Sequence, residues 1–301
     1  LHYPLRRQRQ MCKETDGALH GWQFNGPLNL SSARLEQDNL KPQGWRLQGQ
    51  ATVAGSAGTL RGKLSNDSEL QLDLAASLDE NHDLQLKATL GELFLRSGNP
   101  LAKTLVQWPE LLDLNSGRLN ADASLALAAG SNAPSLDLNL TGKGLGGIYD
   151  RTELSGVDTL LQFQLARQRF ELYVQQLKIQ QANPGLPIGP LETRIRYAAP
   201  LASALAGQLE VNLARTALMG GQVTLTPGQW NLAAGNQLFP IHIRGLEQQL
   251  FALYPAEGLA GSGTLDGDLP VRLGQNGIEI EQGHVAARQP GGHLQLSLIH
   301  I

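Results

Sequence analysis

Apolar and polar residues alternate along most of this chain, and that period of two restricts what it can fold into. Leu70, Leu72 and Leu74 are separated by polar residues, and similar segments recur as far as Ile278-Glu279-Ile280. Successive side chains of a strand point to opposite faces, so each segment would have one apolar and one polar face. Buried parallel strands would instead be apolar on both faces. The pattern therefore predicts antiparallel strands with one face in water.

Clusters of Gly, Asn, Asp and Pro interrupt the alternating segments, for example at 79–82, 130–134, 183–189 and 274–277. Such clusters suit the loops of β-hairpins. The chain has no strict repeat length, which favours an irregular meander over a regular β-solenoid. We therefore predict a mainly β fold, a long twisted antiparallel sheet.

Only two short stretches are typical of helices. The first is Pro100 to Trp108, with Pro in the first turn and Ser97 or Asn99 as the cap. The second is Leu246 to Tyr254, where leucines recur at helical spacing before Pro255. We expect both helices to pack at an edge or across one side of the sheet.

Charge and cysteine content exclude several classes of protein. The chain has 24 basic and 27 acidic residues, a formal net charge of −3, which is not the charge balance of a protein that binds nucleic acid through a clustered basic face. The one tight basic cluster, Arg6, Arg7 and Arg9, is interpreted as solvated, with a juxtamembrane role as the alternative. A single cysteine, Cys12, allows no disulfide within the chain and no cysteine-based zinc site.

The motifs of catalysis and of metal or cofactor binding are missing from the sequence. The seven histidines form no HExxH pair, and there is no GxSxG elbow, P-loop or CxxC. His242 is expected to face solvent, and His284 and His293 are not expected to share a metal. The glycines at 261–267 are followed by a strand segment rather than the helix that a dinucleotide fingerprint needs. We predict a protein that is not an enzyme and that needs no cofactor.

The segment 246–296 carries a likeness to a known family. It contains an L-x-G-x-L-P-V step and a strand that ends in a P-G-G turn. The matching residues are Leu265, Gly267, Leu269, Pro270 and Val271, then Gly283, Val285, Ala287, Pro290, Gly291 and Gly292. This order and spacing resemble the carboxy-terminal domain of the YdbH family. Upstream, residues 108–119 resemble the helix-then-G-x-L element of AsmA and TamB relatives.

The resemblance implies an antiparallel sheet curled into an elongated U-shaped trough with an apolar inner face. Such proteins are anchored in the inner membrane, cross the periplasm and move phospholipid, with a small outer-membrane lipoprotein as a partner at the far end. We expect residues 1–245 to form the trough segment and 246–295 the carboxy-terminal motif region. The inner-membrane anchor would lie in a missing amino-terminal part. Residues 296–301 resemble a translated sequencing adapter and are assigned no role.

We predict that phospholipid acyl chains contact the apolar faces of the strands. The candidate wall residues, chosen by alternation alone, are Leu119, Ala121, Ala123, Leu125, Leu136, Leu138, Leu140, Leu161, Phe163, Leu165, Leu209, Val211 and Leu213. The alternative is a structural or adhesive β module whose apolar faces fill their own core. An outer-membrane barrel is disfavoured because aromatic girdles are missing.

Overall fold

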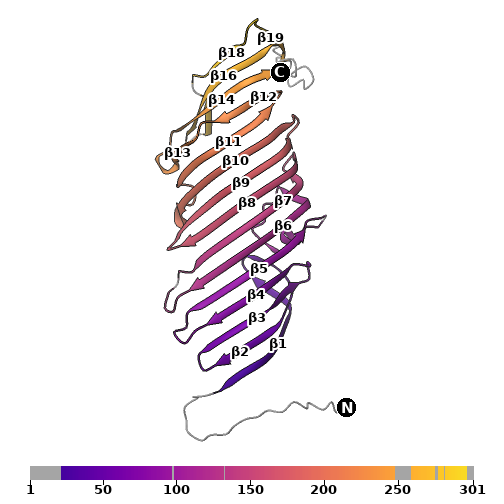
Figure 1. Ribbon diagram of the computed structural model, residues 1–301, viewed down its shortest axis with the longest axis vertical. Coiled ribbons are helices and arrows are strands. Elements are labelled where there is room, and N and C mark those ends of the chain that lie inside the picture. Colours follow the sequence, from indigo (N-terminus) through magenta and orange to yellow (C-terminus); the bar gives the residue numbers. More distant parts are fainter. Residues whose placement is uncertain are drawn as a thin grey trace.

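The protein forms one long, open antiparallel sheet in a computed structural model (Figure 1). The structure describes residues 22–96, 98–131, 133–247, 259–274, 277–280 and 282–296. Seventeen strands make up this sheet, and β15 and β19 pair as a separate two-stranded sheet. The prediction of a mainly β fold with a long antiparallel sheet is confirmed.

The strands and helices follow one another along the chain with short connections. Their bounds are β1 (Gln23–Gln37), β2 (Leu40–Ala54), β3 (Ala57–Asn66), β4 (Gln71–Leu78), β5 (Leu84–Phe94), α1 (Pro100–Thr104), β6 (Leu112–Leu127), β7 (Ser135–Tyr149), β8 (Thr152–Ala166), β9 (Arg169–Asn183), β10 (Ile188–Pro200), η1 (Leu201–Ser203), β11 (Gln208–Leu218), β12 (Gly221–Leu225), β13 (Gly228–Asn231), η2 (Leu232–Ala234), β14 (Gln237–Glu247), β15 (Leu259–Ser262), β16 (Thr264–Gly274), β17 (Gly277–Ile280), β18 (His284–Ala287) and β19 (His293–Leu296).

β1 pairs with β2, and each strand from β2 to β11 pairs with the strand before it and the strand after it in the sequence. The sheet then continues through β12 and β13, both on β11, to β14 and β16. Figure 1 shows the strands stacked along the long axis in sequence order. The predicted loop at 79–82 lies between β4 and β5, and of the predicted loop at 183–189 only residues 184–187 lie between β9 and β10.

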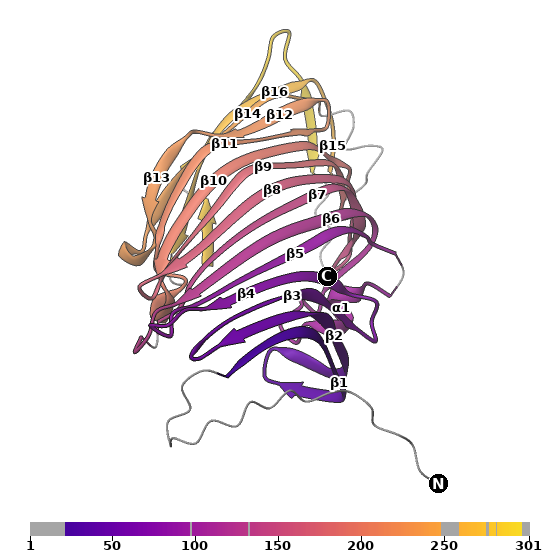
Figure 2. The same cartoon turned by 60° about the horizontal axis from the view of Figure 1, so that its bottom comes forward.

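The strands bend, so the sheet curves into a U in cross-section (Figure 2). Register shifts recur along the sheet, between Leu90 and Leu93 toward the end of β5, between Gly142 and Gly147 in β7, and between Thr193 and Ile195 in β10. A β-bulge bends its strand and increases the local twist. Bulges in successive strands therefore contribute to the curvature of the sheet from β5 to β10.

The first predicted helix is present but shorter than expected. α1 ends at Thr104 rather than Trp108, and Asn99 is its cap, with Oδ1 accepting a hydrogen bond from Leu101 N at 2.9 Å. Leu105 instead forms an isolated bridge with Leu40 of β2. Pairing with the sheet thus replaces the last turn that the leucine spacing predicted.

The second predicted helix is wrong at its start. Leu246 and Glu247 belong to β14 and pair with Leu265 and Thr264 of β16. Residues 248–254 of that prediction lie outside the described residues. Helical spacing of leucines did not decide this segment, because pairing with β16 was available to its first two residues.

The closely packed parts of the sheet gather around α1. Trp45, Leu70, Leu90 and Leu119 form one buried cluster, and Leu101 of α1 packs against it. A second cluster, built around Leu114 and Val157, has Trp108 packed against it. In Figure 2, α1 lies on the inner side of the curved sheet. The face of the sheet that carries these clusters is therefore its concave face.

Candidate functional site

Apolar side chains are aligned in continuous rows across one face of the sheet, here called the apolar face. A strand pair places opposite residues on the same face, so the registers define these rows. Three rows cross β5 to β10 or β11. They are Leu90–Ala121–Leu140–Leu161–Val174–Ile195–Val211, then Ala88–Ala123–Leu138–Phe163–Leu172–Tyr197–Leu209, then Leu86–Leu125–Leu136–Leu165–Phe170–Ala199.

The predicted wall residues of β6, β7 and β8 are brought side by side by this register. Ala121, Leu140 and Leu161 are direct neighbours in one row, and the next row contains Leu138 opposite Phe163. Leu119 lies on the same face one step further along β6, opposite Leu93 and Gly142. The sequence predicted these residues strand by strand, and the structure shows that they are neighbours on one face of the sheet.

In β11 the placement of the predicted residues is mixed. Leu209 and Val211 extend the rows, opposite Tyr197 and Ile195. Leu213 pairs with Arg194, at a register shift next to Ile195, so it lies outside the three rows. Alternation cannot locate such a residue, because a bulge interrupts the period of two.

Two strands between β8 and β11 were missing from the predicted wall. β9 contributes Phe170, Leu172 and Val174, and β10 contributes Ile195 and Tyr197. The rings of Phe163 and Phe170 stack with centroids 5.9 Å apart, and Phe170 contacts Tyr197 at the same separation. The alternation of Ile195-Arg196-Tyr197 was the sequence signal that would have identified β10.

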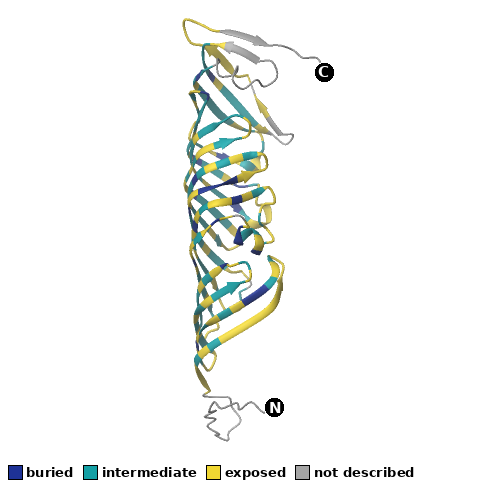
Figure 3. Cartoon of the chain, turned by 90° about the vertical axis from the view of Figure 1, so that its right-hand side faces the viewer, coloured by how far each residue is buried: buried dark blue, intermediate teal, exposed yellow. Residues whose placement is uncertain are grey.

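Most of these side chains are only half-buried. Among the predicted wall residues, Leu119 and Val211 are buried, at 6% and 4% exposure, and the others are of intermediate exposure. Figure 3 shows the same distribution along the sheet, where buried segments are few. Apart from the clusters near α1 and a few buried row residues such as Val211, the apolar face is therefore incompletely covered by other side chains.

The apolar face also contains an open hollow of about 420 Å³, nearer the carboxy-terminal end of the sheet. Leu177, Ile179, Leu191, Ala214, Val223 and Ile241 contribute to its lining. Thr159 and Leu161 are two residues apart in β8 and therefore point to the same face of the sheet. Their partners in β9 are Leu177 and Val174, so Leu177 of the hollow lies on the same face as Val174 of the first apolar row. The apolar surface thus extends past the bulges toward β14.

Charged side chains gather on the opposite face, here called the polar face. One row of this face consists of the residues that alternate in sequence with those of the first two apolar rows. It is Thr89–Asp122–Asn139–Gln162–Tyr173–Arg196–Glu210. Next to it, Glu192 accepts from Arg215 Nε at 3.0 Å and lies 3.1 Å from Lys178 Nζ. Hydrogen bonds from Arg215 and Lys178 lower the pKa of Glu192. This carboxylate is ionised and serves to link three strands.

Carboxylates of β16 also accept hydrogen bonds from cationic side chains of other segments, including β14. Hydrogen bonds from His242 and Arg244 lower the pKa of Asp268, and those from Arg288 and the Gly245 N–H lower the pKa of Asp266. His242 Nε2 lies 2.8 Å from Thr226 Oγ1. His242, expected to face solvent, is half-buried and bonded on both ring nitrogens.

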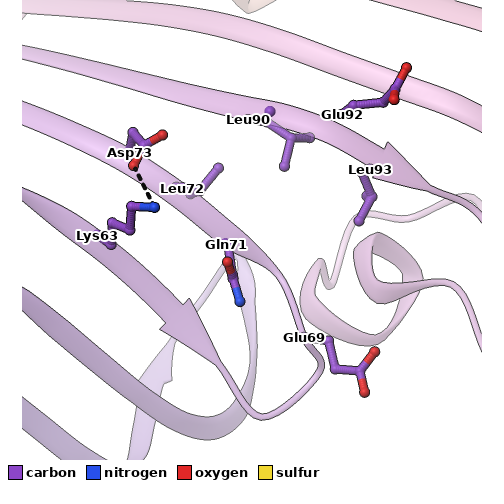
Figure 4. A pocket seen from close by; sticks show the side chains of 9 residues that line it. Lys63, Glu69, Gln71, Leu72, Asp73, Leu90, Glu92 and Leu93 are labelled. Atoms are coloured by element: carbon purple, nitrogen blue, oxygen red, sulfur yellow. Dashed lines mark ion pairs between the residues drawn. The ribbon is translucent and has the colours of Figure 1, made fainter.

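A smaller hollow of about 220 Å³ between β4 and β5 brings three carboxylates together (Figure 4). Each is paired with its own cation: Glu69 with Arg96, Asp73 with Lys63, and Glu92 with Arg118. In the described part of the chain, no three His, Cys, Asp or Glu side chains lie close enough together to hold a metal ion.

The residues that the structure describes include no helix long and apolar enough to cross a membrane.

Comparison with known proteins identifies the family. Residues 11–298 match the YdbH-like family, described as intermembrane phospholipid transport protein YdbH. No curated protein and no solved structure gives a significant match. The matched span covers nearly the whole sequence, including the strands with the apolar rows. The chain therefore belongs to the YdbH-like family of intermembrane phospholipid transport proteins.

Proposed function

We propose that the chain conducts phospholipid along its apolar face, with acyl chains against the rows of Leu, Ala and Phe and the headgroup toward water. The observation that carries this proposal is the continuity of the three rows from β5 to β10. A route for an acyl chain needs an apolar surface without interruption by charge. Each row supplies one, and the charged neighbours point to the polar face.

Physical chemistry explains why such a surface would be needed. Burying a methylene group is worth about 0.8 kcal/mol, so exposing two chains of about 30 methylenes in total costs on the order of 24 kcal/mol. Diffusion of a free lipid through water is correspondingly rare. An apolar face removes most of that cost along the route, and leucine and alanine form no directional bonds that would hold the chains.

The partial exposure of the rows also supports lipid contact over the alternative of a self-filled core. Leucines in a filled core are usually fully covered, whereas Leu138 and Phe163 are half-buried. The alternative is favoured where row residues are fully covered, as at Leu90 and Leu119 in the cluster near α1 and at Val174, Ala199 and Val211 in β9 to β11. We therefore place the lipid route over the central strands β6 to β10.

The location and the partners follow from the family as part of the same proposal. We infer that the sheet works in the periplasm, between the two membranes, with an inner-membrane anchor outside this sequence. A small outer-membrane lipoprotein is the partner proposed for the far end. The polar face, with its ion pairs in water, suits an aqueous compartment.

Mass spectrometry of an organic-solvent extract of the purified chain tests this function. The variant Leu138→Asp, Phe163→Asp places two carboxylates opposite each other on the apolar face. We expect bound phospholipid to fall at least about tenfold, because an unpaired charge against an acyl chain costs more than 1.4 kcal/mol.

The matched control is Asn139→Asp, Gln162→Asp. These two residues are the adjacent pair on the polar face of the same strands, so the control adds the same charge. It should retain its lipid. Equal lipid in all three folded proteins, or none in the parent, would contradict the proposed function and favour the structural module.

A further inference from the structure

A hollow of about 510 Å³ lies beside α1, at a junction of four parts of the chain. β2 contributes Lys41 and Gln43, the β3–β4 turn contributes Asp67 and Ser68, and β6 contributes Asp113. The remaining lining comes from the start of α1 and the residues before it, including Asn99 and Lys103. Segments far apart in the sequence thus place polar side chains around one space.

Two amide groups at this hollow have unused donors. Asn99 is only 3% exposed, and its Oδ1 accepts hydrogen bonds from Leu101 N and Ala102 N, which leaves Nδ2 without a partner. Gln43 Oε1 accepts from Ser68 Oγ at 2.7 Å, which leaves Gln43 Nε2 without one. A buried hydrogen-bond donor without an acceptor lowers the stability of the folded protein by about 1–3 kcal/mol. An acceptor from a ligand would remove that cost.

The charges around the hollow are of both signs. Lys41 Nζ donates to Ala102 O at 2.8 Å, and among the described residues neither Lys41 nor Lys103 has an ion-pair partner. Asp67 accepts from Gly44 N, and Asp113 has no cation beside it in the described structure. Two cations with amide donors suit a phosphate, and two carboxylates suit an ammonium group.

The hollow adjoins the apolar face. Leu40 of β2 and Leu101 of α1 pack against the cluster of Trp45, Leu70, Leu90 and Leu119. Residues next to those two, Lys41 and Ala102, line the hollow. The polar space therefore lies beside the packed end of the apolar face.

We propose that this hollow binds a zwitterionic phosphoethanolamine group, with the phosphate at Lys41, Lys103 and the free amides and the amine at Asp67 and Asp113. This inference rests on the proposed function and makes the headgroup, as well as the acyl chains, a determinant of which lipid is bound. A phospholipid headgroup and a soluble phosphoethanolamine ester share this chemistry, and binding experiments distinguish them.

Equilibrium binding to the purified, delipidated chain tests the inference. The probes are phosphatidylethanolamine, phosphatidylglycerol and diacylglycerol with identical acyl chains, and soluble glycerophosphoethanolamine. We expect phosphatidylethanolamine to bind about tenfold more tightly than diacylglycerol, since hydrogen bonds to charged groups contribute on this scale. Phosphatidylglycerol, without the amine, should bind more weakly than phosphatidylethanolamine.

The variant Lys41→Gln, Lys103→Gln should abolish this preference and leave diacylglycerol binding unchanged. Glutamine at position 41 keeps a donor for Ala102 O, which protects the fold. Lys63→Gln, Lys87→Gln is the control, because both lysines are exposed and lie away from the hollow, opposite Asp73 and Ser124. Circular dichroism confirms that each variant is folded.

Each other outcome has a defined meaning. Equal affinity for phosphatidylethanolamine and diacylglycerol would overturn the headgroup site and leave the proposed function intact. Equal affinity for phosphatidylglycerol would overturn the role of Asp67 and Asp113. Tighter binding of glycerophosphoethanolamine than of the lipid would overturn the lipid as the source. Failure of every lipid to bind would contradict the proposed function itself.

Discussion

At the scale of single residues, two leucines with the same pattern in sequence have different environments. Leu119 and Leu138 both lie on the apolar face, each in an alternating strand. Leu119 is 6% exposed within the cluster of Trp45, Leu70 and Leu90, whereas Leu138 is half-buried. The first residue contributes to stability through packing, and the second is available for contact with a ligand.

Alanine substitution should separate these two roles. Leu119→Ala should lower the free energy of unfolding by about 2–4 kcal/mol, because it leaves a cavity in a packed cluster. Leu138→Ala should lower it by about 1 kcal/mol, since less area is withdrawn from water there. Denaturation with urea in the absence of lipid measures both. Equal losses would mean that the two sites are packed alike.

At the scale of elements, bulges and glycines determine the bend of the strands. β6 and β7 shift register near Ser116 and β7 and β8 shift near Leu145. Gly147, with φ of 157°, sits in this region, and a Cβ there would overlap the backbone oxygen of Asp113 in β6. Close approach of the two backbones thus requires glycine.

Replacing Gly147 with alanine should therefore be harmful to the bend. We expect Gly147→Ala to lower the free energy of unfolding by more than about 1 kcal/mol, because the strands must separate to admit the methyl group. Gly91→Ala is the control, since a Cβ at Gly91 meets nothing within 4 Å. Thermal unfolding followed by circular dichroism compares them. A harmless Gly147→Ala would show that the bulge can relax.

At the scale of the whole molecule, the sheet is held together by neighbours in sequence. β8 pairs with β7 and β9, whereas β1 pairs only with β2 among the described strands. Nearly all residues of β1 are exposed. Such an architecture resembles repeat proteins, in which stability is a sum of local units and their interfaces.

Opening of the sheet should accordingly begin at an end. Amides of β1 should exchange with deuterium at least about tenfold faster than those of β8, because opening β1 breaks one interface and opening β8 breaks two. Hydrogen exchange read by mass spectrometry, with peptides covering each strand, measures this gradient. Uniform exchange across the sheet would indicate a single cooperative unit instead.

The sequence was informative where the period of two was undisturbed. It predicted the antiparallel sheet and the apolar sides of β6, β7 and β8. It failed at Leu213, where a register shift intervenes, and at Leu246, where β16 supplies a partner strand. Arg167 and Gln168 form a tight turn with positive φ at both residues, although neither is a typical turn residue. Local chemistry cannot anticipate such tertiary choices.

Alternation alone determined that this chain makes two-faced strands, because side chains of an extended backbone point to opposite sides in turn. Only the tertiary structure decided which of those faces join. Register aligned Leu138 with Phe163 and connected β8 to β11 through β9 and β10, while bulges curved the sheet around its apolar side. The hollow beside α1 likewise depends on residues from 41 to 113 meeting in space. Pairing between strands is non-local, and a sequence pattern carries no information on which distant residues become neighbours.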